Sequence, residues 1–187
     1  MSLEICEVKN LKGVLVLKPK VYKDSRGWFI ETFKESSFEK LKLPTHFVQD
    51  NHSCSEQKNV LRGLHFQIKP YAQGKLVRCT RGKILDVIVD LRRDSKSFLK
   101  WESFDLSDEN NHMLWIPEGF AHGFLTLTEI SEVQYKTTNE YSPVYERSIR
   151  WNDPIIAVQW GLSDPILNAK DNTAPLLKDI NKSDFFA

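Results

Sequence analysis

The sequence predicts an all-β protein folded as a jelly roll. Two observations support this class: short runs rich in Val, Ile, Phe, Tyr and Trp recur along the chain, and turn residues separate them. Many short strands at regular spacing are typical of a sandwich or barrel, and the jelly roll is a common closed form. A chain of 187 residues with 41% hydrophobic residues can bury one core, and no repeat or linker divides it, so we expect a single domain over residues 1–187.

The expected elements follow one another in order along the chain. Each expected strand is a short run of β-branched, aliphatic and aromatic residues, many of them at alternate positions. These runs span residues 14–19, 28–33, 46–53, 60–67, 75–80, 84–92, 100–107, 112–117, 123–127 and 132–138. Helix is expected only at SSFEKLK (36–42) and in the tail after Asp171.

The charge and cysteine content exclude several classes of protein. The chain has 26 basic and 25 acidic residues, and a net charge of +1 gives no overall field for nucleic acid or an anionic membrane. The first residues lack the pattern of a signal peptide, and no segment has the apolar length of a membrane span, so we expect a soluble, cytoplasmic protein. Cys6, Cys54 and Cys79 have no CxxC spacing and are expected to be reduced thiols.

The segment NVLRGLHFQ (59–67) sets basic residues inside an apolar run. Strict alternation places His65 and Gln67 on one face of a strand and Arg62 on the other. Gly63 leaves two interpretations open. It either forms a bulge that turns Arg62 toward the same pocket as His65, or it is simply a weak point in the strand.

A metal site is one hypothesis for this region. PEGFAHGF (117–124) resembles the second motif of the cupin superfamily, whose metal sites also use a His-x-His pair and a carboxylate. Here Phe66 and Gln67 follow His65, so the second imidazole of that pair is missing. Stable transition-metal sites need at least three protein ligands, and we therefore expect no bound metal.

Proton transfer is the second hypothesis, because a histidine inside a barrel can act as a base when a carboxylate orients it. Asp86 and Asp90 share one face of ILDVIVDLR. A hairpin turned at Arg81 and Gly82 would place Lys75 diagonal to both acids. We therefore expect Lys75 to pair with one of these two aspartates inside the barrel.

A broader resemblance covers nearly the whole chain. Its motifs, in order, are RGWFIETF, FVQDNHS, NVLRGLHFQ, QGKLVRCTRGKILDVIVDLR, LWIPEGFAHGFLTL, QYKTTNEY, RWNDP and AKD. With these motifs the chain resembles the dTDP-4-dehydrorhamnose 3,5-epimerase family of the cupin superfamily. The resemblance implies a cupin-type jelly roll that inverts C3 and C5 of dTDP-4-dehydro-6-deoxyglucose in dTDP-rhamnose biosynthesis, a route to cell-surface polysaccharide, with no metal and no other cofactor.

The resemblance also implies the catalytic roles. His65 matches the family's base, and Asp171 matches the carboxylate that orients it. Tyr135 matches the acid that returns a proton from the opposite face, and Lys75 the cation beside the developing enolate oxygen. These roles agree with the chemistry, because a proton next to a ketone is weakly acidic and its removal needs enolate stabilisation as well as a base.

Further residues match the family's substrate contacts. Besides Lys75, these contacts are Arg26, Glu31, Gln49, Asp50, Asn51, Arg62, Gln67, His122, Tyr141, Glu146 and Lys170. The arginines and lysines among them suit a pyrophosphate group. The chain departs from the family at Glu140, where an aromatic residue is often found, and matches it loosely over GLSDPILNAK (161–170).

The resemblance implies a homodimer, and the aromatic-rich segment WFIETF (28–33) suits strand exchange between two subunits. Three alternatives remain at this stage. A related enzyme could invert C3 alone or act on another nucleotide-linked 4-keto sugar. A non-catalytic sugar-binding jelly roll and a metal-dependent cupin oxygenase are alternatives from other classes.

Overall fold

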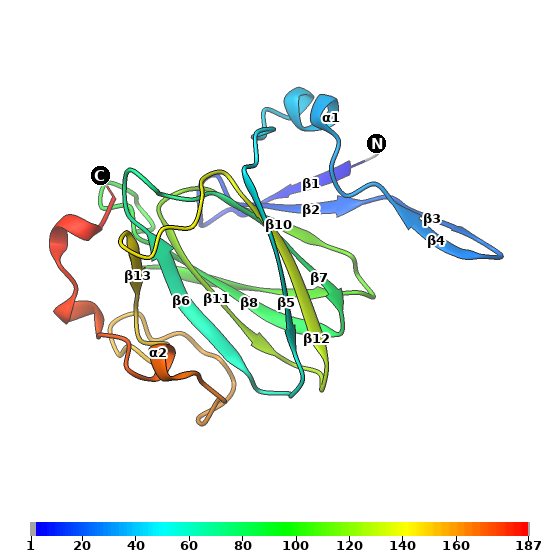
Figure 1. The fold of residues 1–187 in the computed structure, drawn as a ribbon. Coiled ribbons are helices and arrows are strands. Elements are labelled where there is room, and N and C mark those ends of the chain that lie inside the picture. Colours follow the sequence, from blue (N-terminus) through cyan, green and yellow to red (C-terminus); the bar gives the residue numbers. More distant parts are fainter. Residues whose placement is uncertain (1–2, 187) are drawn as a thin grey trace.

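A computed structural model describes residues 3–186, and it is built mainly of antiparallel strands (Figure 1). Within these residues, one sheet of six strands has the order β1-β2-β10-β7-β12-β5, and a sheet of five has the order β13-β6-β11-β8-β9. A two-stranded hairpin, β3-β4, stands apart from both. The two larger sheets enclose a common apolar core, which confirms the predicted all-β jelly roll.

The strands are short, as expected from the spacing of the turns. The six-stranded sheet contains β1 (Leu3–Glu7), β2 (Leu15–Pro19), β10 (Met113–Ile116), β7 (Lys75–Arg81), β12 (Ser131–Thr137) and β5 (Gln49–Ser55). The five-stranded sheet contains β13 (Glu146–Ser148), β6 (Leu61–Gln67), β11 (Phe120–Thr126), β8 (Lys83–Asp90) and β9 (Trp101–Ser107). The hairpin consists of β3 (Val21–Asp24) and β4 (Gly27–Ile30).

Helices are few and short. They are α1 (Glu35–Lys40), α2 (Ala169–Asn172) and two 3₁₀ turns, Leu177–Asp179 and Lys182–Asp184. The expected helix at 36–42 is thus confirmed with slightly different bounds, and the helical tail is split into separate single turns. In residues 3–186 no helix has both the length and the apolar character needed to span a membrane.

The core between the sheets is made by alternate residues of the strands. Val77 of β7, Ile88 of β8, Phe124 of β11 and Val133 of β12 all belong to one buried cluster. Residues of the opposite parity on β8, such as Val87, pack on the other side of the five-stranded sheet. Period-two alternation therefore separates two apolar layers on this sheet.

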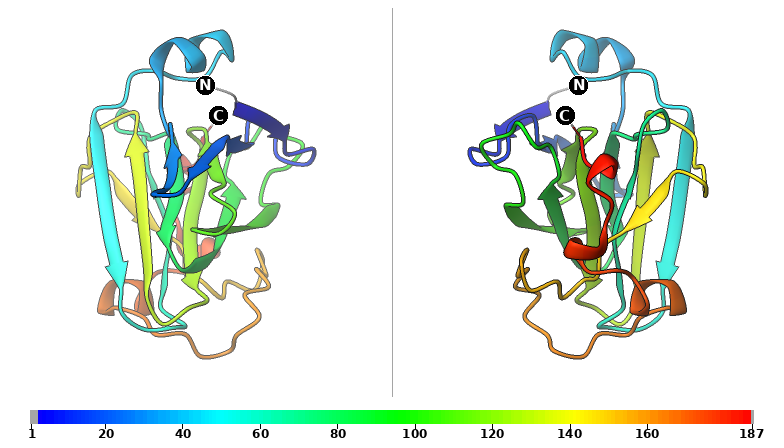
Figure 2. Two further views of the ribbon diagram at one scale, coloured as in Figure 1. Left: turned by 90° about the vertical axis from the view of Figure 1, so that its right-hand side faces the viewer. Right: turned by 90° about the vertical axis from the view of Figure 1, so that its left-hand side faces the viewer.

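The outer layers come from the ends of the chain. The segment after β13 packs Trp160, Leu177 and Phe186 against the outer face of the five-stranded sheet, where Figure 2 shows it in orange to red. Phe38 of α1 packs with Trp115 and other residues on the outer face of the six-stranded sheet. Parts of the outer faces of both larger sheets are thus covered by segments from outside the central strands.

The structure corrects one expected pairing. β7 and β8 are consecutive, but β7 pairs with β10 and β12, whereas β8 pairs with β9 and β11. The turn at Gly82, whose φ is +72°, carries the chain from one sheet to the other instead of closing a hairpin. Because both strands are apolar on the face toward the core, they bury more surface facing each other than side by side.

Strands β1, β3 and β13 were not predicted. All three are short and partly exposed. Leu3 and Ile5 of β1 do alternate with Glu4, but over too few residues to predict a strand, and VYKD and ERS show no apolar alternation. β3 and β4 form a hairpin that projects from the body of the molecule (Figure 1). Its large side chains Tyr22, Trp28 and Phe29 are exposed.

Candidate active site

A bulge in β6 sets the geometry of the site. His65 lies opposite His122 on β11, but the next aligned pair is Arg62 opposite Phe124. Three steps along β6 therefore match two along β11, so β6 contains one extra residue. The extra residue reverses the alternation and brings Arg62 and His65 to the same face, which confirms the bulge interpretation of Gly63.

Gly63 and Gly123 permit the bulge because their backbones lie very close together. Gly63 has φ +131°, and a Cβ atom added there would lie 2.5 Å from Cα of Gly123. A side chain at this position would meet backbone atoms that cannot move aside. Glycine is therefore required where the two histidine-bearing strands approach.

His65 forms a dyad with Asp171. Its Nε2 lies 2.5 Å from Oδ1 of Asp171, which is fully buried on α2. The side chain of Asn168 caps this helix by accepting a hydrogen bond from the backbone N–H of Asp171, at 2.7 Å. The carboxylate fixes the orientation of the ring and leaves Nδ1 for proton exchange.

His122 forms a second dyad, with Asp86. Its Nε2 lies 2.8 Å from Oδ2 of Asp86, and both residues are buried. The contact is a diagonal one, since His122 lies opposite Ile88 in the pairing of β11 with β8. Asp86 was one of two aspartates, with Asp90, expected to pair with Lys75 inside the barrel, and it was not assigned to the site. Its alternation with Ile84 and Ile88 was the signal for a place in the core.

Lys75 enters the cavity from the six-stranded sheet, on the same face of β7 as the buried Val77. Burial lowers the pKa of Lys75 to about 8, while the negative charges of Asp86 and Glu146 act in the opposite direction. The lysine is thus inside the barrel and faces Asp86, as expected. In the described part of the chain, however, it forms no ion pair with Asp86 or Asp90.

Asp90 is bound elsewhere. Its carboxylate accepts hydrogen bonds from the guanidinium of Arg92 at 2.8 and 2.9 Å and from the hydroxyls of Ser95 and Ser97 at 2.7 and 2.6 Å. Burial raises the pKa of Asp90, but these hydrogen bonds outweigh it and hold the pKa below its ordinary value. Asp90, the last residue of β8, therefore anchors the loop that follows this strand and is not paired with Lys75.

Tyr135 reaches the cavity from β12, again from the sheet opposite His65. It lies opposite Asn51 on β5 and Val77 on β7. Burial raises the pKa of Tyr135, and the positive charge of Arg62 only partly offsets this. The phenol is therefore held in its protonated form, as a proton donor requires.

Glu146, Lys170 and Tyr141 form a polar cluster at the rim. Nζ of Lys170 lies 2.5 Å from Oε1 of Glu146, and the Tyr141 hydroxyl donates to Oε2 at 2.8 Å. Burial raises the pKa of Glu146, but these bonds outweigh it and lower the pKa below its ordinary value. The positive charge of His65 would also favour the ionised carboxylate, which indicates that this cluster lies next to the first dyad.

Two amides hold the loop between β12 and β13 against the site. The Gln67 side chain donates to the carbonyls of Tyr71 and Glu140, and it accepts from the backbone N–H of Ser142 at 2.7 Å. Gln49 accepts from the N–H of Tyr141 at 2.8 Å and donates to Oδ1 of Asn51, at 2.9 Å. These contacts position Tyr141 beside the cavity. Glu140 itself is exposed.

Three of the residues expected to contact the substrate, Arg26, Asp50 and Glu31, lie away from the His65–Asp171 dyad of their own chain. Arg26 is at the tip of the β3-β4 hairpin, where its side chain is 88% exposed and pairs with Asp24 at 2.6 Å. Asp50 is on the outer face of β5, paired with Lys136 at 2.9 Å. Glu31 follows β4, so it lies at the base of the same hairpin.

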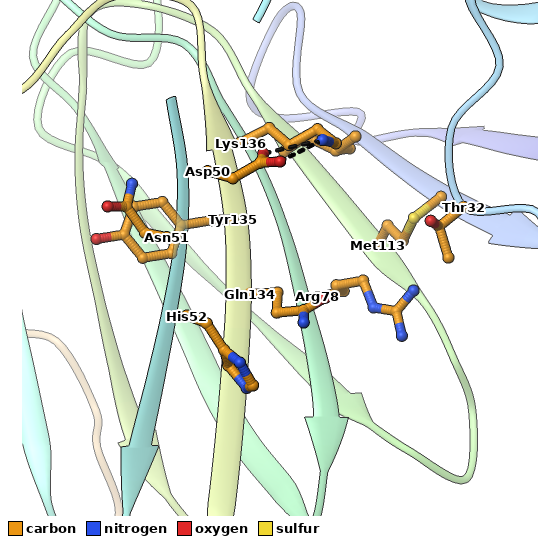
Figure 3. A pocket seen from close by; sticks show the side chains of 10 residues that line it. Thr32, Asp50, Asn51, His52, Arg78, Met113, Gln134, Tyr135 and Lys136 are labelled. Carbon is orange, nitrogen blue, oxygen red and sulfur yellow. Dashed lines mark hydrogen bonds and ion pairs between the residues drawn. The ribbon is translucent and has the colours of Figure 1, made fainter. Parts of the chain in front are cut away.

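The outer face of the six-stranded sheet has a separate pocket of about 250 Å³ (Figure 3). Its lining includes Thr32, Asp50, Arg78 and Gln134. In Figure 3 the side chains of Tyr135 and Asn51 point to the other side of the sheet from Gln134 and Arg78, as alternation requires. The pocket therefore lies on the side of the sheet away from His65, although Tyr135 and Asn51 are also among the residues that line it.

Metal ligands do not gather in the described part of the chain. Among residues 3–186, no group of three or more His, Cys, Asp and Glu side chains is arranged to hold a metal ion. His65 and His122 are neighbours, but each directs its Nε2 to its own carboxylate. The arrangement suits proton transfer, because each imidazole is oriented by a buried acid.

Known proteins match both the sequence and the fold. A family model described as dTDP-4-dehydrorhamnose 3,5-epimerase matches residues 8–179. The dTDP-4-dehydrorhamnose 3,5-epimerase of Salmonella typhimurium is 56% identical over 169 residues, which cover 89% of this chain and 92% of the relative. A Legionella pneumophila epimerase, solved in complex with dTDP-4-keto-L-rhamnose, has a TM-score of 0.93 at 41% identity and covers 99% of this chain and 98% of its own.

A more distant structure represents one of the alternatives. ChmJ from Streptomyces bikiniensis, a 3'-monoepimerase solved with dTDP-quinovose, has a TM-score of 0.83 at 32% identity, covering 89% of this chain and 84% of its own. The matches confirm the cupin-type jelly roll and the expected isomerase class, and they do not support a non-catalytic sugar-binding protein. The chain belongs to the dTDP-4-dehydrorhamnose 3,5-epimerase family.

Proposed function

We propose that this protein converts dTDP-4-dehydro-6-deoxyglucose to dTDP-4-dehydrorhamnose by inverting C3 and C5. The observation that carries the proposal is the placement of a His65–Asp171 dyad on one sheet and Tyr135 on the facing sheet. Inversion requires a base and an acid on opposite sides of the sugar ring, and the two sheets provide those sides. Lys75 supplies positive charge in the same cavity.

In the first step, His65 removes the proton from a carbon beside the ketone. Asp171 stabilises the imidazolium that forms, because a buried carboxylate at 2.5 Å interacts strongly with a charged ring. The electrons of the broken C–H bond move toward the ketone oxygen and form an enolate. Lys75 stabilises that oxygen. Because its pKa is about 8, Lys75 is protonated in most molecules at neutral pH.

In the second step, Tyr135 donates its proton to the carbon from the opposite face. The raised pKa of the buried phenol keeps it protonated until the carbanion forms. His65 is then an imidazolium and Tyr135 a phenolate, so His65 must release its proton to solvent and Tyr135 must take one up. The same pair of groups can then act on the second carbon flanking the ketone after the sugar turns or shifts in the cavity. No step requires a metal or a redox cofactor, and we propose that the protein uses neither.

The rim residues are proposed to hold the nucleotide. Arg62 and Lys170 carry positive charge beside the cavity and suit the pyrophosphate. Tyr141 is an exposed aromatic side chain, oriented by Glu146, and suits stacking on the base. Gln49, Asn51, Gln67 and His122 complete the proposed contacts from the walls of the site.

A homodimer is proposed to bring the remaining contacts into place. Trp28 and Phe29 in the projecting β3-β4 hairpin are 58% and 66% exposed. Large apolar side chains exposed next to each other often mark a surface that binds another protein. Arg26 at its tip and Glu31 at its base lie outside the cavity of their own chain. If the hairpin of a second copy packs at the cavity rim, these residues reach the nucleotide. We also propose that residues 1–187 form one domain and that the enzyme works in the cytoplasm.

Double inversion is favoured over inversion of C3 alone. The identity to the Salmonella 3,5-epimerase is higher than that to the monoepimerase ChmJ. The same residues, however, serve both reactions, so the distinction needs a direct measurement.

Incubation with dTDP-4-dehydro-6-deoxyglucose in deuterated water tests the proposal. We expect deuterium at both C3 and C5 of the product, and full activity after treatment with EDTA. Label at C3 alone would identify a monoepimerase, and binding of dTDP without exchange would contradict the catalytic function. Activity that is lost with EDTA and restored by iron or zinc would indicate the oxygenase-like metal chemistry instead.

A further inference from the structure

Asp86 is a buried acid with an unfulfilled bonding capacity. It lies in the middle of β8, opposite Phe124 of β11 and Phe104 of β9, and it has no exposed surface. Ile84 and Ile88 flank it on the same face and belong to the apolar core. A carboxylate in such surroundings is costly unless hydrogen bonds and charges compensate it.

The hydrogen bonds of Asp86 use only one of its oxygens. Oδ2 bonds Nε2 of His122 at 2.8 Å, whereas the buried Oδ1 has no hydrogen-bond partner among residues 3–186. Asp90, on the same strand and also fully buried, accepts bonds on both oxygens from Arg92, Ser95 and Ser97. The fold therefore satisfies one acid of β8 completely and leaves the other with one buried acceptor atom unbonded.

The charged and titratable neighbours of Asp86 come from two strands, β11 and β7. His122 bonds it from β11, and Lys75 and Cys79 face it across the core from β7. Lys75 in turn faces Glu146 of β13 and Lys170 of α2. Of the two acids that favour its ammonium form, Asp86 has the stronger influence. Glu146 is already bound by Lys170 and Tyr141.

We propose that Asp86 is a positioning residue for epimerisation, which orients His122 through a hydrogen bond from one oxygen and, through its buried negative charge, keeps the Lys75 ammonium on the facing strand charged. This inference rests on the proposed function, because it assigns Asp86 a part in placing the cation that stabilises the enolate. The substrate's ketone oxygen would then meet a lysine and a histidine that share one buried anion.

The direction of the pH effect follows from the charges. Lys75 stabilises an enolate only when protonated, so activity falls as pH rises through the pKa of Lys75, about 8. Removing the negative charge of Asp86 removes a contribution that raises this pKa. The alkaline limb of the pH–rate profile should therefore move to lower pH in Asp86→Asn.

The experiment compares the pH dependence of deuterium exchange in wild type, Asp86→Asn and Asp90→Asn, each checked for dTDP binding. We expect the alkaline limb of Asp86→Asn to move down by about one pH unit. Because the pKa of Lys75 is about 8 in the wild type, its protonated fraction at pH 8 would fall from about one half to about one eleventh, which lowers the rate there about fivefold. Asp90→Asn removes an equally buried acid from the same strand, and its alkaline limb should stay in place. A guanidinium stays charged over this pH range. In the Lys75→Arg background, adding Asp86→Asn should therefore leave the alkaline limb of the pH–rate profile in place.

Two results would overturn the inference. One is an Asp86→Asn enzyme whose rate falls equally at all pH values with an unmoved limb, as a purely structural loss would produce. The other is a ¹⁵N-lysine titration of the folded protein in which Lys75 has the same pKa in wild type and variant. That titration needs no turnover, so it distinguishes failure of this inference from an absence of exchange by the wild type. If Asp86→Asn does not fold, Asp86→Ser, whose hydroxyl can still bond His122, replaces it.

Discussion

His65 and His122 lie directly opposite each other on neighbouring strands, and each is hydrogen-bonded to a different buried carboxylate. Asp171 holds the first from α2, and Asp86 holds the second from β8. The two imidazoles therefore share one cavity wall but have separate electrostatic surroundings. This separation allows the two dyads to be tested independently.

Asp171→Asn should slow proton exchange at both carbons. The amide still orients the ring but no longer stabilises the imidazolium, and loss of such general-base assistance costs about 10²–10⁴-fold in rate. Binding of dTDP, measured calorimetrically, should change little. Asp153→Asn is the matched control, because Asp153 is also buried but bonds backbone N–H groups of Ile155, Ile156 and Leu177. Exchange that is as fast in Asp171→Asn as in the control would contradict the proposed base.

Tyr135→Phe should separate proton removal from inversion. Without the phenol, His65 still takes a proton and returns it to the same face, so deuterium enters the substrate without formation of the epimer. Mass spectrometry measures the label, and NMR of the sugar measures the configuration. Tyr145→Phe, which alters a tyrosine stacked on Tyr71, serves as the control and should yield the inverted product. Normal inversion by Tyr135→Phe would show that another group is the acid.

Gly63→Ala should destabilise the protein strongly. The new methyl group would lie 2.5 Å from Gly123, and alanine disfavours φ +131°. Overpacking and backbone strain each cost about 1–3 kcal/mol, so we expect the variant to lose a large part of its free energy of unfolding. Gly161→Ala isolates the strain, since φ is +71° there but no atom lies within 4 Å of the added carbon. Urea denaturation of the two variants should rank Gly63→Ala as the less stable.

A Trp28→Ser, Phe29→Ser double variant tests the proposed subunit exchange. Loss of these exposed apolar side chains should shift the protein toward the monomer, as measured by light scattering, and should weaken dTDP binding if Arg26 and Glu31 act on the second copy. Val144→Ser removes an even more exposed apolar side chain, 74% exposed, from another surface and should leave the assembly unchanged. A monomeric wild type would contradict the homodimer.

Much of the fold was predictable because hydrophobic alternation at period two is strong in the central strands. ILDVIVDLR separates Ile84 and Ile88 from Val87, and the two sets occupy different apolar layers. Strand partners were not predictable in the same way. The facing apolar sides of β7 and β8 fit a sandwich as well as a hairpin, and only the whole topology decides between them.

Local sequence predicted only part of the candidate site, because the direction of each side chain also depends on strand register and on contacts between distant segments. His65 and Asp171 meet despite their separation in the chain, but this pairing came from resemblance and not from any pattern in the residues. Alternation placed Asp86 and Asp90 on one face without deciding which of them enters the barrel, and the bond of Asp86 to His122 depends on the register of β11 with β8. The direction of the Arg62 side chain depends on the bulge at Gly63. A glycine in a strand indicates either such a bulge or a weak point in the strand, so the sequence did not decide between them.

The bulge also determines which length changes the protein tolerates. Leu61 and Leu64 point into the outer apolar layer, and the extra residue between Arg62 and His65 keeps both of these polar groups out of it. Deleting a single residue there would restore regular alternation and place either the arginine or the histidine beside Trp160 and Ile149. A loop could absorb the same deletion. In this strand, a change of one residue in length would turn polar side chains to the apolar face and apolar side chains to the face that carries His65.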